Sequence, residues 1–316
     1  MRRDFFKNAR ILRYVVIQLG YTLFIVAVTF FLTYAVLLPR LNQRVNIVQS
    51  VSDPTSSQDA STNQSDYVER GSAYDNRTVD NATESSNVIF HGPRDKKRIA
   101  LTFDAEMTEG MKTNYLSGKA KSSYDNRIVD TLNSTQTKAT FFLTGMWIEL
   151  YPDVTQQFSN NPLFELGSHS YSDRSYYGFC YGLKKMPSTV RVEDIGATEK
   201  LLREHAGIDN RLFRFPGGCY SPDDVKLVNE ANDIVVHWDV SGVDGFNTSS
   251  NQIIRNVVDN AQNGSIIILH LNGAPTSPKT AEALPSIISQ LKAKGFEFVK
   301  ISELLGLPPA PHTPAY

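Results

Sequence analysis

The order of hydrophobic and polar positions divides the chain into three regions. Residues 14–38, YVVIQLGYTLFIVAVTFFLTYAVLL, form one long apolar run that contains no charged residue. The stretch that follows, up to about residue 90, is rich in Ser, Thr, Asn and Asp and poor in large apolar side chains. From residue 97 onward, short apolar runs alternate with amphipathic stretches. This pattern predicts a membrane-type segment, a spacer and a folded domain.

The first apolar run predicts a transmembrane helix. A helix needs about 20 apolar residues to cross a bilayer, and this run meets that length while being apolar on every side. Five basic residues and one aspartate precede it, which by the positive-inside rule keeps the N-terminus in the cytoplasm. The run is longer than the core of a cleaved signal peptide, and no small-residue cleavage site follows it. We expect a cytoplasmic tail at 1–13, an uncleaved signal anchor at 14–38 and a cell-membrane protein with its domain extracytoplasmic.

The polar stretch at 39–90 predicts a flexible linker. It has too few apolar side chains to offset the entropy that ordering it would cost. A flexible chain of n residues spans roughly 5–6 Å × √n on average. The linker would therefore hold the domain clear of the membrane surface.

The region 97–306 predicts an α/β domain, with a short tail at 307–316. Apolar runs of strand length include RIALTFDA, ATFFLTG, FELGSHS, RLFRFPGG, DIVVHWDV and SIIILHL. The stretches between them have helical periodicity, with a capping residue at Ser221 and a stop at Gly295. Six or seven strand-then-helix units favour a parallel barrel over an open sheet. The segments 107–126 and 174–189 are expected to be loops.

Composition narrows the function classes. The chain has 316 residues, a net charge of -1, 41% hydrophobic and 21% charged residues, which is ordinary for a globular protein. A nucleic-acid-binding protein would need a basic face, so we expect no nucleic acid partner. The two cysteines, Cys180 and Cys219, are too few for a thiolate zinc site. They either pair outside the cell or remain free thiols.

Residues that can carry chemistry stand where the apolar runs end. They are Asp104, Glu106, His169, Arg214, Asp239, Asp244 and His270. Active residues of parallel α/β barrels gather at the carboxyl ends of the strands. Taken singly, each aspartate is typical of a turn or a helix cap, and a single histidine of a half-buried core residue. Together they predict one shared polar site.

The same segments resemble the motifs of the NodB-type polysaccharide deacetylases, carbohydrate esterase family 4. ALTFDAE resembles the family's Thr-Phe-Asp-Asp-Gly motif, ELGSHSYSD its His-Ser/Thr-x-x-His motif, and LFRFPGG its Arg-x-Pro-x-Gly motif. WDVSGVDG resembles the segment that ends in Asp-Trp, and IIILH the Leu-x-His motif. The resemblance covers about 97–305 in the family's order. It implies a distorted (β/α) barrel that uses a divalent metal to remove N-acetyl groups from an N-acetylated glycan.

The metal motifs depart from the family pattern. The usual ligand positions hold Ala105, His169 and Asp173, so one ligand of three is unchanged. Glu106 lies one residue beyond Ala105, and Asp173 lies at i+4 from His169, a spacing that shares a face in a helical turn. We expect Glu106, His169 and Asp173 to hold one ion of Zn, Mn or Co, with weaker zinc selectivity because the ligands are rich in oxygen. The alternative is a site without metal, in which Asp173 caps a turn.

The resemblance also implies roles for the other residues of the site. Asp104 would be the general base and His270 the acid that protonates the leaving amine. Arg214 would orient Asp104, and Asp244 would orient His270; the alternative for both is a plain ion pair. The backbone N–H of Gly217 would donate to the oxyanion.

The walls of the substrate pocket are less well marked. Trp238 and Leu269 would line the slot for the acetyl methyl group, although core packing explains both nearly as well. The family's tryptophan after the last aspartate is Gly245 here.

Three functions compete at this point. The first is a membrane-anchored, metal-dependent de-N-acetylase acting on a cell-wall or chitin-like polysaccharide. The second is a non-catalytic glycan-binding relative that has lost the metal site. The third is a hydrolase of a small amide or imide, which the membrane anchor and spacer disfavour.

Overall fold

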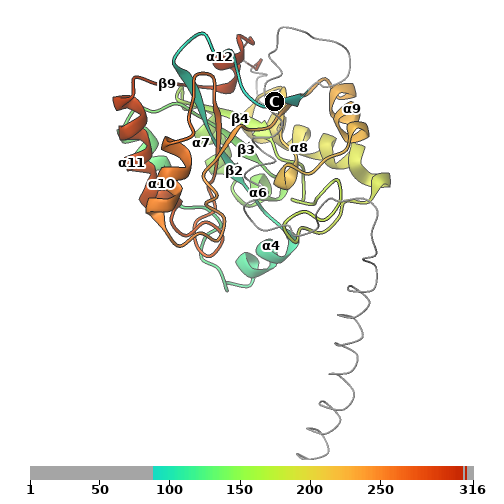
Figure 1. Cartoon of the computed structure of the whole chain (residues 1–316). Helices are drawn as coiled ribbons and strands as arrows, with labels where there is room; N and C mark the ends of the chain where they lie inside the picture. The colour runs from blue at the N-terminus through green and yellow to red at the C-terminus, as the bar shows by residue number, and fades with distance from the viewer. Residues whose placement is uncertain (1–87, 309, 312–316) are drawn as a thin grey trace, which may run out of the picture. The chain divides into compact units, whose positions relative to one another are not determined.

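The computed structural model describes residues 88–308 and 310–311, which form a parallel sheet covered by helices (Figure 1). The order in the sheet is β1-β6-β5-β4-β3-β2-β8-β7, and β9 also pairs with β2. Every ladder between these strands is parallel. The strands are β1 (Val88–Ile89), β2 (Arg98–Ala105), β3 (Ala139–Leu143), β4 (Phe164–Ser168), β5 (Leu212–Phe213), β6 (Ile234–Val236), β7 (Val240–Ser241), β8 (Ile266–His270) and β9 (Glu297–Val299).

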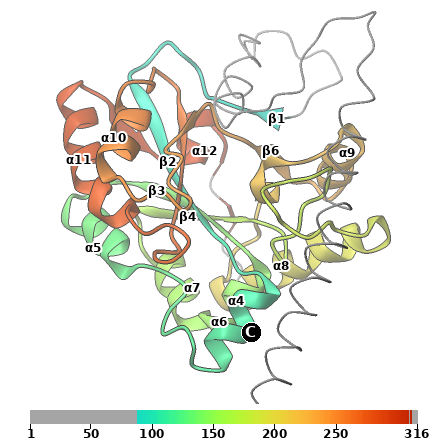
Figure 2. The same cartoon turned by 60° about the horizontal axis from the view of Figure 1, so that its bottom comes forward.

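The predicted barrel is an open half-barrel. Its hydrogen-bonded path ends at β1 and at β7 instead of closing. Figure 2 shows β1 next to β6 at one end of the sheet. The two end strands, β1 and β7, have two residues each, so each end of the sheet offers few ladder hydrogen bonds. Beyond β6 the chain leaves the sheet, and the Asp239 side chain, not a strand, accepts a hydrogen bond from the Ile266 N–H. The parallel β/α prediction is confirmed, and the distorted barrel that we expected is a half-barrel.

Helices follow most strands and pack against the sheet. They are α4 (Glu109–Leu116), α5 (Asn126–Ser134), α6 (Gly145–Leu150), α7 (Pro152–Ser159), α8 (Arg191–Ala206), α9 (Pro222–Glu230), α10 (Ser250–Val258), α11 (Thr280–Ala293) and α12 (Ile301–Leu305), with short 3₁₀ turns at Ser188–Val190 and Pro216–Gly218. Ser221 caps α9 in a reciprocal capping box with Asp224, as its position predicted. Gly295 follows the end of α11 at a left-handed φ of 85°.

Three elements differ from the sequence predictions. Helix α4 lies inside the expected loop 107–126, and it was missed because it buries none of its residues. The stretch of helical periodicity between β3 and β4 forms two helices, α6 and α7, because Pro152 disfavours helical backbone at the preceding Tyr151. Strand β1 lies inside the range assigned to the linker and pairs with β6.

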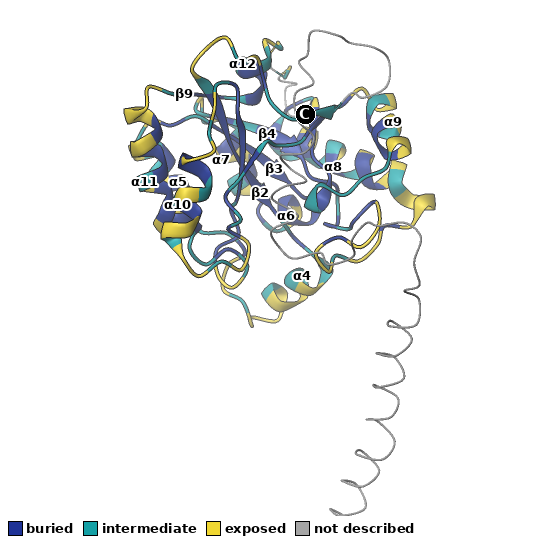
Figure 3. Ribbon diagram, viewed as in Figure 1, coloured by how far each residue is buried: buried dark blue, intermediate teal, exposed yellow. Residues whose placement is uncertain are grey.

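Alternation along β2 separates a helix-facing side from an interior side. Leu101, Phe103 and Ala105 are fully buried in the core shared with the helices. Burial of such a leucine or phenylalanine contributes about 1.5–3 kcal/mol. Thr102 and Asp104 occupy the alternate positions, where side chains point to the opposite face. Figure 3 shows the buried strands beneath helices whose outer faces are exposed.

Within the described part of the chain, no helix is both long and apolar enough to cross a membrane. The predicted cytoplasmic tail, the predicted anchor at 14–38 and the linker up to residue 87 lie outside that part, as does the end of the C-terminal tail at 312–316.

Candidate active site

Asp104 and Arg214 form a buried ion pair at the carboxyl end of β2. Asp104 Oδ1 accepts a hydrogen bond of 2.8 Å from Arg214 Nη1, and both side chains are almost fully buried. Arg214 also donates to Thr102 Oγ1 and to the backbone carbonyls of Val236 and His237. Its guanidinium lies 4.0 Å from the centre of the Phe142 ring. These contacts fix Arg214, and through it one oxygen of Asp104.

His169 and Asp173 approach each other in a turn beyond β4. Ser170 and Asp173 both have positive φ, 62° and 54°, so the i+4 spacing is bridged by irregular backbone and not by the helical turn that we expected. His169 Nδ1 lies 2.9 Å from the Arg214 carbonyl oxygen, which places the proton on Nδ1. The other ring nitrogen, Nε2, faces Asp104 Oδ2 at 3.6 Å and Asp173 Oδ1 at 3.9 Å.

Glu106 completes a group of three metal-type ligands with His169 and Asp173. One ligand atom from each lies within 4.8 Å of the others. Glu106 is held at its backbone, because its N–H donates to Asn272 Oδ1 and its carbonyl accepts from Asn272 Nδ2. The structure therefore brings together the three residues that the sequence proposed as ligands.

The group fits a divalent cation. His169 Nε2 and Asp173 Oδ1 are buried and find no hydrogen-bond partner among the described residues. Leaving a buried polar atom unpaired costs about 1–3 kcal/mol, and a cation between the two atoms would remove that cost. Burial, followed by the charges of Glu106 and Asp104, raises the pKa of Asp173 well above its usual value. Burial lowers the pKa of His169, which favours the neutral imidazole that binds metals.

His270 stands beside Asp104 at the end of β8, in register with it. Its Nδ1 lies 2.8 Å from Asp244 Oδ1, and its Nε2 lies 3.4 Å from Glu106 Oε1. Burial lowers the pKa of His270, but the charges of Asp244 and Glu106 outweigh it and raise that pKa well above the usual value. The imidazolium is therefore the favoured form, as an acid requires.

Asp244 is held in place by three donors. It accepts hydrogen bonds from the His270 ring, from the His270 N–H at 2.8 Å and from Thr280 Oγ1 at 2.5 Å. Burial raises the pKa of Asp244, while the charge and hydrogen bond of His270 lower it, with a net lowering. Asp244 thus keeps a proton on His270 Nδ1 and fixes the orientation of the ring.

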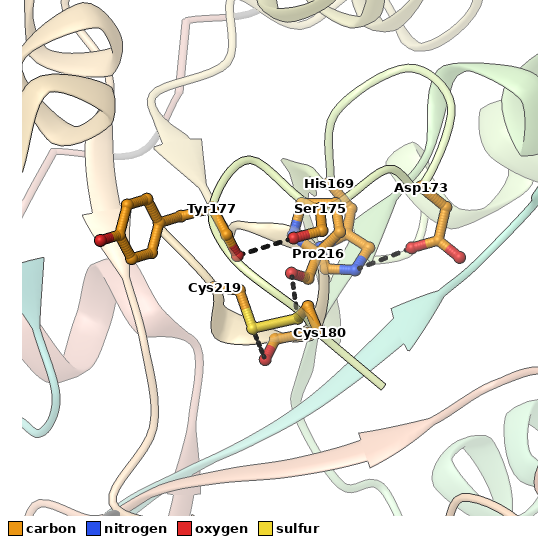
Figure 4. The surroundings of a disulfide bond; sticks show 8 residues. His169, Asp173, Ser175, Tyr177, Cys180, Pro216 and Cys219 are labelled. Atoms are coloured by element: carbon orange, nitrogen blue, oxygen red, sulfur yellow. Dashed lines mark hydrogen bonds and ion pairs between the residues drawn. A yellow bond between two sulfur atoms is a disulfide. The ribbon is translucent and has the colours of Figure 1, made fainter. Parts of the chain in front are cut away.

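A disulfide bridge covers Gly217. Cys180 and Cys219 are joined by a disulfide bond, which settles the alternative that the sequence left open (Figure 4). Gly217 has φ 59°, and a Cβ atom there would lie 2.4 Å from Cys180 Sγ. Left-handed backbone and the close approach of sulfur together require glycine. The bridge links the loop beyond Asp173 to the segment after Arg214.

Two residues predicted near the site lie elsewhere. Leu269 is fully buried in the helix-facing core with Ile253 of α10, because it alternates with His270 along β8. It therefore does not line the pocket. Asp239 directly precedes β7 in the chain and lies at the amino end of β8, where it accepts from the Ile266 N–H and pairs with Arg94.

The other wall residues have mixed surroundings. Trp238 is partly buried, stacks on His237 at 3.9 Å between ring centres and lies 5.6 Å from the Arg214 guanidinium. Its place in an acetyl slot stays a prediction. Gly245 has open space around it, since no atom would lie within 4 Å of an added Cβ.

The sequence reasoning missed Asn272 and Thr280. Asn272 comes two residues after His270 and ties the backbone of Glu106 to Ser123. Its position just beyond a strand end was a usable signal. Thr280 begins α11, far from any strand end in the sequence, and nothing marked it.

Comparison with known proteins identifies the relatives of the chain. The family model for "Polysaccharide deacetylase" matches residues 91–234. A peptidoglycan-N-acetylglucosamine deacetylase of Bacillus cereus is 31% identical over 215 residues, which are 68% of this chain and 70% of that protein.

Solved structures agree with this relationship. A peptidoglycan N-acetylglucosamine deacetylase, solved in complex with an N-hydroxybenzamide compound, is 29% identical, with a TM-score of 0.60, over 71% of this chain and 94% of that one. A family 4 acetyl xylan esterase from Clostridium thermocellum, in complex with a cobalt ion, is 28% identical, with a TM-score of 0.52, over 66% and 92%.

A pseudoenzyme of the same family shares the fold. That protein, from Bacillus anthracis, is 23% identical, with a TM-score of 0.56, over 70% of this chain and 69% of the pseudoenzyme. The matched family model and the Bacillus cereus relative span the strands that carry Asp104, His169 and Arg214. The chain belongs to the polysaccharide deacetylase family, carbohydrate esterase family 4.

Proposed function

We propose that this chain is a metal-dependent de-N-acetylase that acts on amino sugars of a cell-wall or chitin-like polysaccharide. The observation that carries the proposal is a pair of buried atoms without hydrogen-bond partners among the described residues, His169 Nε2 and Asp173 Oδ1. They lie 3.9 Å apart, and His169 Nε2 also faces Asp104 Oδ2 at 3.6 Å. The names of the relatives, which deacetylate peptidoglycan N-acetylglucosamine, support the choice of substrate.

The chemistry begins with a water molecule at Asp104. Glu106, His169 and Asp173 would hold a divalent ion, which supplies Lewis-acid polarisation of the acetyl carbonyl and lowers the pKa of water. Asp104 Oδ2 is the oxygen that Arg214 leaves unengaged, so it accepts the proton of the attacking water as general base. The water oxygen bonds to the acetyl carbon, and the carbonyl oxygen gains negative charge.

Gly217 and His270 complete the reaction. The Gly217 N–H, in the left-handed turn three residues after Arg214, would donate to the oxyanion. The C–N bond then breaks, and the leaving nitrogen takes a proton from His270 Nε2. The products are acetate and the free amine of the sugar.

Arg214 and Asp244 are positioning residues in this scheme. Arg214 fixes one oxygen of Asp104 and favours its charged form. Asp244 holds the His270 ring through Nδ1 and stabilises its imidazolium. Neither group needs to touch the substrate.

The proposal also places the domain outside the cell membrane. Its support is the charge-free apolar run at 14–38 behind a basic N-terminus and the disulfide between Cys180 and Cys219. Disulfides persist in oxidising, extracytoplasmic compartments. Protease added to intact cells should remove an epitope placed at the C-terminus and spare one placed at the N-terminus.

The deciding experiment combines metal content with acetate release. The full chain is purified in mild detergent without chelator, and its metal is measured by elemental analysis. Acetate release from N-acetylglucosamine oligomers is then followed with Zn, Mn, Co or no metal. We expect about one metal per chain and metal-dependent acetate release, with activity not confined to zinc. Oligomer binding without metal and without acetate would instead establish the non-catalytic glycan-binding alternative.

A further inference from the structure

A rigid loop stands over the oxyanion residue. We call residues 174–186, which connect the turn after β4 to the segment before α8, the stapled loop. Its two ends are joined by backbone hydrogen bonds, from the Ser175 N–H to the Lys184 carbonyl at 2.9 Å and from the Met186 N–H to the Ser175 carbonyl at 2.7 Å. Between them the disulfide ties Cys180 to Cys219. The loop is therefore fixed at its base and near its tip.

This fixed loop exposes aromatic rings. Phe179 and Tyr181, on either side of Cys180, are 85% and 63% exposed. Tyr181 has φ 48°, a left-handed conformation that is unusual for a bulky residue. Gly178 and Gly182 are left-handed as well, so the chain reverses around Cys180. Strained backbone of this kind persists where the surroundings over-determine it, and it concentrates at ligand sites.

Tyr181 lies beside Gly217, the residue proposed to bind the oxyanion. An added Cβ on Gly217 would lie 3.1 Å from Tyr181 Cδ2 and 2.4 Å from Cys180 Sγ. The ring is thus in contact range of the residue that donates to the oxyanion in the proposed reaction, while most of its surface faces solvent. Tyr177 differs, although it is 59% exposed in the same loop. Figure 4 shows its ring directed away from His169 and Asp173, on the other side of the disulfide.

We propose that Phe179 and Tyr181 form a stacking subsite for a pyranose ring of the glycan, next to the sugar that is deacetylated. This inference rests on the proposed function. A pyranose presents C–H groups on its faces, and an aromatic ring offers a rigid apolar surface whose ordering entropy is small. The disulfide pre-organises that surface, so binding does not have to order the loop. The subsite makes the enzyme selective for chains over single sugars.

The test compares a long and a short substrate. Phe179→Ala removes one ring, and Tyr181→Asn removes the other with a residue that tolerates left-handed backbone. With an N-acetylglucosamine pentamer we expect KM to rise about tenfold in each variant, equivalent to about 1.4 kcal/mol, with kcat unchanged. With the single sugar N-acetylglucosamine, which cannot reach the neighbouring subsite, kcat/KM should change less than twofold. Tyr177→Ala is the matched control and should leave both substrates unaffected.

A binding measurement separates the subsite from the reaction. Calorimetric titration of the full chain, stripped of metal, with the pentamer reports the subsite without turnover. Weaker pentamer binding in Phe179→Ala and Tyr181→Asn supports the subsite even if no acetate is ever released. Unchanged pentamer binding and KM in both variants overturn the subsite while leaving deacetylation intact. Loss of binding to phosphatidylglycerol vesicles in the two variants, with pentamer binding unchanged, would also overturn it, because the rings would then serve the membrane.

Discussion

Asp239 and Asp104 each lie 2.8 Å from an arginine. They lie at opposite ends of the strands, and they differ in how many of their oxygens accept hydrogen bonds from the protein. Asp239, beside the amino end of β8, accepts from Arg94 and Ser265 through Oδ2 and from the Ile266 N–H through Oδ1. Asp104, at the end of β2, accepts from Arg214 through Oδ1. The histidine nitrogen nearest its Oδ2, His169 Nε2, is 3.6 Å away, beyond hydrogen-bonding distance.

The difference indicates which carboxylate is available for chemistry. Both oxygens of Asp239 accept hydrogen bonds from protein donors. This carboxylate therefore has a structural role and no free oxygen that could act on a substrate. Asp104 keeps one oxygen directed toward the orphaned His169 nitrogen. In the sequence the two aspartates look equivalent, because each follows an apolar run. In the structure they differ, because only Asp104 has an oxygen that no protein donor occupies.

The largest expected effect is on the reaction rate of Asp104→Asn. The amide oxygen can still accept from Arg214, but it cannot take a proton from water. General bases contribute typically about 10²–10⁴-fold, so acetate release should fall by about that factor. Circular dichroism and thermal unfolding check that the variant folds. An Asp104→Asn protein with near-normal kcat would remove Asp104 from the role of base and erase its contrast with Asp239.

The next largest expected effect is a loss of metal affinity in Asp173→Asn. The substitution replaces a charged ligand by a neutral amide at the carboxylate whose Oδ1 is orphaned. Even loss of an outer partner of a ligand costs about 10–100-fold in metal affinity, and loss of the ligand charge should cost at least that. Titration with Zn and Mn measures the change without turnover. Asp153→Asn, on the exposed start of α7, is the matched control; equal affinities in the two variants would contradict the assignment.

The sequence predicted the order of the β/α units and the grouping of Glu106, His169 and Asp173. Both predictions follow from patterns that can be read along the chain. Strand-length apolar runs and the parallel arrangement place their carboxyl ends along one rim. It could not predict that the sheet stays open, which depends on how few residues the end strands β1 and β7 contribute. To place Leu269, one must know which residues of β8 face the helices. Leu269 is adjacent to His270 along the strand, so the two side chains point to opposite faces of the sheet. The backbone support of Glu106 by Asn272 is a contact between segments far apart in the chain.

A stability effect is expected for Asp239→Asn. The pair with Arg94 is partly exposed, with side chains 16% and 35% accessible, so its charge contributes little. The hydrogen bonds that the carboxylate accepts from Ser265 and Ile266 are charge-assisted and buried more deeply. We expect a loss of about 1–2 kcal/mol, or about 2–4 °C in Tm for each kcal/mol, with kcat unchanged. A drop in kcat at normal stability would instead assign Asp239 a role in the reaction, and would contradict the distinction drawn between Asp239 and Asp104.

The smallest expected effect concerns Asp233, a third aspartate, which directly precedes β6 and is 5% exposed. Burial, followed by the charge and hydrogen bond of Glu199 on α8, raises its pKa to about 8. Burial also raises the pKa of Glu199. Asp239 faces hydrogen-bond donors, whereas Asp233 faces a second carboxyl group, that of Glu199. A proton held between the two carboxyl groups provides the hydrogen bond that two carboxylates could not form.

The sign of the pH dependence follows from that proton. Between the ordinary carboxyl pKa of 3.8 and about 8, the folded chain holds a proton at Asp233 that the unfolded chain releases. Its stabilising contribution is complete below 3.8 and is lost as the pH rises through about 8. Asp233→Asn cannot titrate, and its amide can donate to Glu199 at every pH. Thermal unfolding at pH 5, 6, 7 and 8 should therefore show the variant gaining a few degrees on the wild type as the pH rises. The exposed Asp259→Asn should follow the wild type, and parallel curves for all three proteins would show that no proton is shared at Asp233.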